Sequence, residues 1–76
     1  MEIFPGVSMD PAVRFGKPCI KGTRVDVATI VGALAAGEEI VAVADAYGLT
    51  REQILDTLAF VAHVADHLPP AVQKAS

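Results

Sequence analysis

The chain has 76 residues, of which 53% are apolar, and its mean hydropathy is +0.47. A single domain of this length buries only about 60% of its unfolded surface, so this composition predicts contact with a further protein surface, either a second copy or another chain. The formal net charge is −3. Residues 1–26 hold four Lys or Arg against three acidic residues, whereas residues 27–76 hold two against six. A surface that binds polyanions must therefore draw on the N-terminal segment.

Composition also bears on the compartment. The longest apolar run is far below the roughly 18 residues that span a bilayer, and Met1-Glu2-Ile3 lacks the basic start of a signal peptide. The single cysteine, Cys19, cannot form an internal disulfide, which fits a reducing compartment. We therefore expect a cytoplasmic protein that does not associate with membranes.

The first 25 residues contain short extended pieces. Ile3–Ser8 alternates apolar and other residues but is interrupted by Pro5-Gly6, which suits an edge strand or an extended arm. Lys17–Ile20 and Thr23–Val25 are strand-like and are joined by a short link in which Gly22 can adopt positive φ. These pieces predict a basic β-hairpin, which is stable only when docked on another element.

From residue 26 the apolar period changes from 2 to 3.6, which predicts helices. Asp26 is the expected N-cap of a first helix that ends at Gly37. Glu38-Glu39 suits the start of a second helix that ends at Gly48. The predicted buried positions are Val27, Ile30, Val31 and Leu34 in the first helix, and Ile40, Val43, Ala44 and Tyr47 in the second.

A third helix is predicted from a capping box, with Thr50 as N-cap and Gln53 reaching back to it. The helix continues towards Pro69-Pro70, which forbids further helix, and residues 69–76 are expected to form a short flexible tail. Its predicted core face comprises Ile54, Leu58, Val61 and Ala65. Phe60 and Val64 lie off that face, which predicts a contact with a second copy or a protein partner, unless the N-terminal strands cover them.

The expected fold is thus mainly α: a short N-terminal β-hairpin or arm (1–25) and a three-helix helix-turn-helix unit (26–68) of winged-helix or homeodomain-like type, in one domain. In such a unit the last helix enters the major groove of DNA. The residues that would face bases are Thr50, Arg51, Gln53 and Thr57. The alternative is an ordinary three-helix core, because Glu52 and Asp56 would face phosphates in a groove.

Three cations, Lys17, Lys21 and Arg24, mark the predicted hairpin. They could form a solvated face that protects an edge strand from aggregation. They could bind phosphates beside the helix-turn-helix unit. They could also enter an acidic pocket of a protein partner, where an Arg fork and carboxylates form strong charge-assisted hydrogen bonds.

Motifs for catalysis are weak. His63 and His67 have the i, i+4 spacing of metal ligands, but the chain offers no convincing third ligand, so a small metal-dependent enzyme is only a remote alternative. Cys19 suits a small core residue better than a nucleophile. The G-x-x-x-x-G-K-[ST] pattern of nucleotide-binding loops is absent. We expect a protein without a cofactor, a metal or enzymatic activity.

The segment Gly16-Lys17-Pro18-Cys19-Ile20-Lys21-Gly22-Thr23-Arg24-Val25, with later matches such as Leu34-Ala35-Ala36-Gly37 and Leu49-Thr50, closely resembles the domain-of-unknown-function 433 family over about residues 3–65. That resemblance implies the antitoxin of a type II toxin–antitoxin pair with a β-extended helix-turn-helix fold. Its implied partner is a PIN-like nuclease toxin encoded by the neighbouring gene, with Arg24 or Lys21 entering a carboxylate site that holds a divalent metal.

The resemblance also implies repression of the protein's own operon through binding of operator DNA, for which a homodimer would set the half-site spacing. The chain departs from the family at Tyr47-Gly48, where members often have Tyr-Pro, and the connection here is one residue shorter. This shorter turn is closer to an ordinary helix-turn-helix. The alternative function is therefore a stand-alone dimeric helix-turn-helix transcription regulator.

Overall fold

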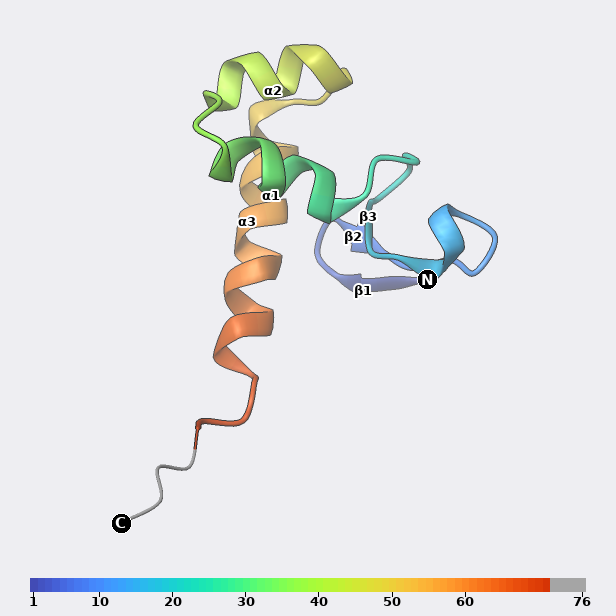
Figure 1. Ribbon diagram of the computed structural model, residues 1–76. Helices are drawn as coiled ribbons and strands as arrows, with labels where there is room; N and C mark the ends of the chain where they lie inside the picture. Colours follow the sequence, from blue (N-terminus) through green and yellow to red (C-terminus); the bar gives the residue numbers. More distant parts are fainter. Residues whose placement is uncertain (72–76) are drawn as a thin grey trace.

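A computed structural model describes residues 1–71 (Figure 1). Its elements are β1 (Glu2–Phe4), β2 (Val7–Ser8), the 3₁₀ turn η1 (Arg14–Gly16), β3 (Cys19–Ile20), α1 (Val27–Ala35), α2 (Ile40–Tyr47) and α3 (Arg51–Asp66). The mainly α class with an N-terminal β arm is therefore confirmed. Most of the tail predicted at residues 69–76 lies outside the described residues.

The three strands form one small antiparallel sheet in the order β1-β2-β3. β1 and β2 are joined through Pro5-Gly6, and β2 pairs with β3 so that Val7 lies opposite Ile20. The arm at residues 3–8 is therefore itself a hairpin, with the break in its alternation at the turn. Figure 1 shows this sheet beside the helices, with α1 and α2 against α3.

The predicted hairpin between Lys17–Ile20 and Thr23–Val25 forms only in part: Cys19 makes an antiparallel bridge with Asp26, but no strand is present at Thr23–Val25, and β3 also pairs with β2. Hydrogen bonds of the Thr23 side chain close the turn between these residues. The Thr23 hydroxyl donates to the Ile20 carbonyl at 2.8 Å and accepts from the Val25 N–H at 3.0 Å. The Ile20 N–H donates to the Val25 carbonyl at 2.9 Å. These three hydrogen bonds satisfy backbone groups of Ile20 and Val25 without a second regular strand.

The helix ends follow the predicted signals with one exception. Thr50 and Gln53 form both hydrogen bonds of the capping box, and Gly48 ends α2 with φ +67. Asp26 occupies the N-cap position of α1, but its side chain caps no backbone N–H. Its carboxylate accepts from the Thr29 hydroxyl and lies 3.9 Å from Arg14 Nη2. The predicted side-chain cap is therefore wrong, because these two groups occupy the carboxylate.

The core joins β3 to all three helices. Its buried members are Ile20, Ile30, Val43, Ala44, Leu49 and Ile54. Tyr47, predicted to be buried, is 42% exposed. It is the last residue of a two-turn helix, and Leu49 is buried just after it, held by an N–H bond to the Ala44 carbonyl at 2.8 Å.

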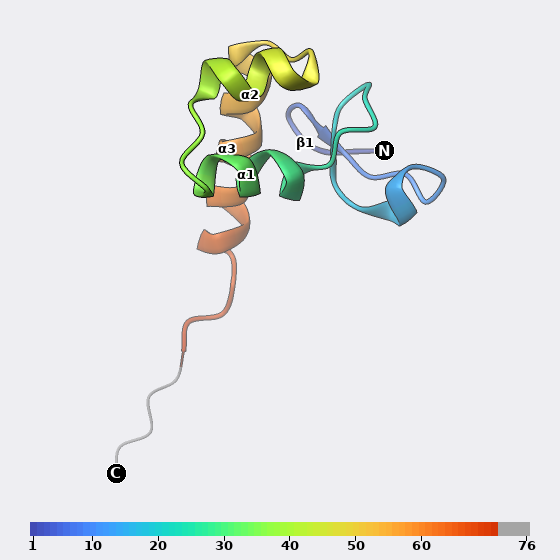
Figure 2. The same ribbon diagram turned by 45° about the horizontal axis from the view of Figure 1, so that its top comes forward.

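The C-terminal half of α3 extends beyond α1 and α2 in both views (Figures 1 and 2). Ala65, predicted for the core face, is consequently exposed, whereas Leu58 and Val61 are half-buried. No helix in the described part of the chain combines the length and the apolar character needed to cross a membrane.

Phe60 is covered from within the chain. The ring of Phe4 on β1 lies 5.6 Å from the Phe60 ring in an edge-on arrangement, which is typical of a favourable aromatic pair. The N-terminal strand β1 therefore covers part of Phe60, which is half-buried, and a contact of Phe60 with a partner stays a prediction. Val64 is 42% exposed.

Gly6 and Gly22 provide a matched test of how closely the sheet packs on α3. Both have positive φ, +86 and +78, but a Cβ on Gly6 would lie 2.8 Å from Asp56 Oδ2, whereas a Cβ on Gly22 would meet nothing within 4 Å. Gly22→Ala should lower the free energy of unfolding by about 1–2 kcal/mol through backbone strain. Gly6→Ala should cost about 1–3 kcal/mol more through overpacking. Urea unfolding of both variants measures the difference, and equal losses would contradict this packing.

Candidate functional site

The three predicted cations are exposed and lie on two neighbouring loops. Lys17 follows η1, and Lys21 and Arg24 flank the turn that contains Gly22. Lys21 Nζ lies 3.3 Å from Glu2 Oε1. The pKa of Glu2 is lowered first by a hydrogen bond from the Gly6 N–H and then by Lys21. Part of the Lys21 charge is thus neutralised within the chain, while no ion pair is found for Arg24 among residues 1–71.

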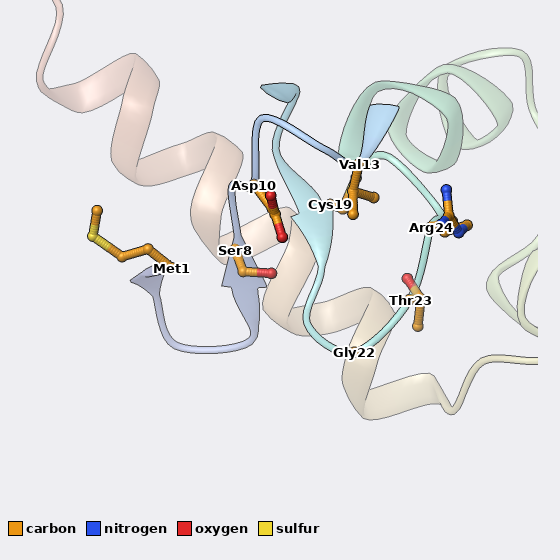
Figure 3. Close-up of a pocket in the computed structure, with 8 residues that line it drawn as sticks. All are labelled: Met1, Ser8, Asp10, Val13, Cys19, Gly22, Thr23 and Arg24. Carbon is orange, nitrogen blue, oxygen red and sulfur yellow. The ribbon is translucent and has the colours of Figure 1, made fainter. Parts of the chain in front are cut away.

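Arg24 lines a surface pocket of about 340 Å³ between the turn and the N-terminal segment. Figure 3 shows Ser8 and Asp10 on one side of this pocket and Thr23 and Arg24 on the other. The turn geometry explains the placement, because the Thr23 hydroxyl is held by the backbone on both of its sides. Arg24 is therefore presented at the rim by a short, hydrogen-bonded turn.

Cys19 also lines this pocket but is only 3% exposed. Its thiol donates to the Lys17 carbonyl at 3.4 Å. Burial, and then the nearby Asp26 carboxylate, raise the pKa of the thiol above its usual value. A buried, protonated thiol is a poor nucleophile, so the position of Cys19 agrees with its predicted role as a small core residue.

The predicted DNA-contacting residues do not share one environment. Thr50 and Arg51 are exposed at the start of α3. Gln53 is half-buried, and its Oε1 accepts the Thr50 N–H at 2.8 Å. Thr57 is fully buried, and its hydroxyl donates to the Gln53 carbonyl at 2.9 Å. Thr57 is therefore removed from the set, because a buried side chain cannot reach a base edge.

The two histidines stack on each other, with ring centroids 4.0 Å apart, and His63 also lies 5.1 Å from the Phe4 ring. His67 Nδ1 lies 2.8 Å from the His63 carbonyl oxygen. Residues 1–71 contain no group of three or more His, Cys, Asp or Glu side chains that could hold a metal ion. The pair therefore extends the aromatic contact between β1 and α3.

Two features near the cations were not apparent from the sequence. Arg14 pairs with the buried Asp26, and Phe15, the next residue, is 94% exposed. Both have positive φ, +49 and +58. The only sequence signal is an aromatic residue immediately before Gly16 that no strand or helix period explains.

Within residues 1–71, the fold and site consist of three helices and an N-terminal sheet that presents a short basic turn beside a surface pocket. The family model described as "Protein of unknown function (DUF433)" matches residues 7–61. This range includes β2, β3, the basic turn and most of the helical part. The chain belongs to that family.

Two of the matches, one to a curated protein and one to a crystal structure, come from Mycobacterium tuberculosis. The chain is 43% identical over 56 residues to a protein of strain ATCC 25618 / H37Rv named "Putative antitoxin VapB45", and the match covers 74% of this chain and 23% of that protein. The crystal structure of Rv2018 from the same species is similar with a TM-score of 0.63 at 44% identity, covering 68% of this chain and 24% of that one. The chain therefore matches about a quarter of the length of each.

The buried thiol gives a direct solution test of the site. In the native protein at pH 8, iodoacetamide should modify Cys19 at least about tenfold more slowly than in the urea-unfolded chain, because burial limits access and the raised pKa of the thiol lowers the thiolate fraction. Intact-mass spectrometry over time measures both rates. Similar rates in the two states would show that the pocket floor opens readily.

Proposed function

We propose that this chain is the antitoxin of a type II toxin–antitoxin pair and that it neutralises a PIN-like nuclease toxin encoded by the neighbouring gene. The observation that carries the proposal is the 43% identity to a protein that bears an antitoxin name, in a match that contains the basic turn. The protein acts in the cytoplasm, without enzymatic activity of its own, and needs neither a metal nor a cofactor.

The chemistry of the turn supports the partner. A PIN-like nuclease holds its divalent metal in a cluster of carboxylates, and a guanidinium group matches the geometry of a carboxylate with two parallel hydrogen bonds. Arg24 is exposed at the rim of a pocket, and Lys17 lies on the adjoining loop. Lys21 is less available, because Glu2 pairs with it. Arg24 is therefore the cation that enters the acidic site, with Lys17 beside it.

Charge reversal at Arg24 tests this contact. Arg24→Glu should abolish co-purification of a tagged chain with the neighbouring gene's product, because it places a carboxylate against the toxin's own carboxylates. Arg51→Glu is the matched control, since it makes the same change at an exposed arginine at the start of α3. Co-expression, affinity pull-down and mass determination of the complex provide the measurement.

The results distinguish the antitoxin proposal from the assignment of Arg24 as the contact residue. If the wild-type chain forms no complex with that product, the antitoxin proposal fails. If the wild-type and both variants bind equally well, the partner stands but the Arg24 assignment does not. Circular dichroism of the purified variants excludes loss of folding as the cause.

The second candidate, carried by different residues, is DNA binding as a helix-turn-helix regulator, either alone or as autoregulation of the operon. The helices α2 and α3 are joined by only three residues, Gly48 to Thr50, and Arg51 is exposed at the first position of α3. Arginine reads guanine through paired hydrogen bonds in the major groove. Few cations lie near it, so binding is weak for one copy and a homodimer is required to double the contacts.

Arg51→Ala should weaken binding to the chain's own upstream region by about tenfold or more, the scale of one lost bidentate base contact. Glu52→Gln should have the opposite effect, because it removes a carboxylate from the same exposed turn of α3. Fluorescence anisotropy at fixed salt measures both affinities. Unchanged affinity in both variants would exclude α3 as the recognition helix.

A further inference from the structure

Phe15 is the most exposed large apolar side chain in the described residues, with 94% of its surface accessible. It nevertheless lies in an ordered loop. The Gly16 N–H donates to the Val13 carbonyl at 3.0 Å and the Lys17 N–H to the Arg14 carbonyl at 3.1 Å. The loop geometry is thus specified by hydrogen bonds while the aromatic ring contributes almost nothing to the chain's own core.

The backbone at Phe15 makes this exposure costly. Its φ of +58 and ψ of +31 place a bulky aromatic residue in the left-handed region, where such a residue is a rare outlier. Arg14, at φ +49, directs its guanidinium towards the buried Asp26 carboxylate, 3.9 Å away. The loop therefore turns Arg14 inwards and Phe15 outwards. Strain of this kind is found where function requires a particular side chain in a fixed position.

Phe15 is part of a larger apolar surface. A shallow hollow of about 670 Å³ is lined by Met1, Ile3, Met9, Pro11, Phe15 and Gly16. Figures 1 and 2 both show the η1 loop and the Lys21–Arg24 turn on the side of the molecule away from the C-terminal half of α3. Met1 lines both this hollow and the pocket of Arg24. The apolar surface and the basic turn are therefore adjacent.

Charge decides between the possible occupants. Around this surface Arg14 pairs with Asp26 and Lys21 with Glu2. Lys17 and Arg24 are left against Asp10, whose Oδ1 already accepts the Ala12 N–H at 2.9 Å. A symmetric contact between two copies would bring these cations together, which opposes association. An acidic protein surface with an apolar recess fits the same face.

We propose that the Phe15 surface, defined as the six residues around the hollow, is the apolar anchor that docks onto the nuclease toxin next to its carboxylate site. This inference rests on the proposed function and assigns the anchoring contact to a residue outside the basic turn. Phe15 provides the buried aromatic contact on which interface energies concentrate. Its fixed loop reduces the ordering cost of binding, and Arg24 provides the polar contact beside it.

The test uses two variants that separate the ring from the backbone. Phe15→Gly removes both the ring and the strain, and Phe15→Ala removes the ring but keeps a Cβ at positive φ. Both should weaken toxin binding by at least about tenfold in biolayer interferometry. The melting temperature of Phe15→Gly should stay at or rise above that of the wild type by up to about 5 °C, since glycine tolerates this φ. Val41→Ala, at an exposed apolar position on α2, is the matched control and should bind normally.

Each outcome decides the inference. Weaker binding by both Phe15 variants, with stability retained, supports the anchor. Wild-type binding by either variant overturns it while the antitoxin function stands, and the absence of any wild-type complex overturns both. If sedimentation shows that Phe15→Gly dissociates a homodimer without affecting toxin binding, the occupant is a second copy and the proposal is wrong.

Discussion

The burial of Ile20 is the constraint on which the placement of the basic turn depends. This side chain is 1% exposed and packs in one cluster with Ile30, Val43 and Ile54, residues that come from all three helices. Its backbone simultaneously belongs to β3 and to the turn closed by Thr23. Because one residue anchors the sheet, the core and the basic turn, the position of Arg24 relative to the helices is fixed by hydrophobic packing.

This constraint gives a physical reason for the most specific stretch of sequence, residues 16–25. Cys19 and Ile20 are buried, Gly22 supplies the positive φ, and the Thr23 hydroxyl closes the turn. These residues are structural, and they leave the cations as the side chains that face outwards. Residues 16–25 therefore form a structural turn, and the proposed binding contacts belong to the exposed cations between its structural positions.

The helices could be predicted because their ends depend on local chemistry. The capping box at Thr50 and the positive φ at Gly48 act within a few residues, so the sequence contains all the information they need. The strand pairing could not be predicted in the same way. Ile20 has a local partner and a more distant one: its N–H donates to the Val25 carbonyl across the turn, and it also lies opposite Val7 of β2, a contact that no local residue pattern specifies.

The candidate site was harder to predict from the sequence than the fold, for a related reason. Exposure depends on what packs against a residue from elsewhere in the chain: Thr57, predicted to face a groove, is fully buried, and Phe60, predicted to contact a partner, also packs against Phe4. Phe15 follows no strand or helix period. What distinguishes it is an unfavourable backbone conformation, which only the three-dimensional structure shows.

Phe60 and Phe15 differ enough that the apolar residues outside the core should not be treated as a single interaction surface. Phe60 has ordinary helical geometry and is half-buried against Phe4 of the chain's own sheet, so packing within the chain accounts for part of its surface. Phe15 has a strained backbone and an almost fully exposed side chain, so selection for folding stability alone would not favour it. A small core leaves little stability to spare, and a residue that lowers stability without packing is best explained by a contact that forms only in the complex.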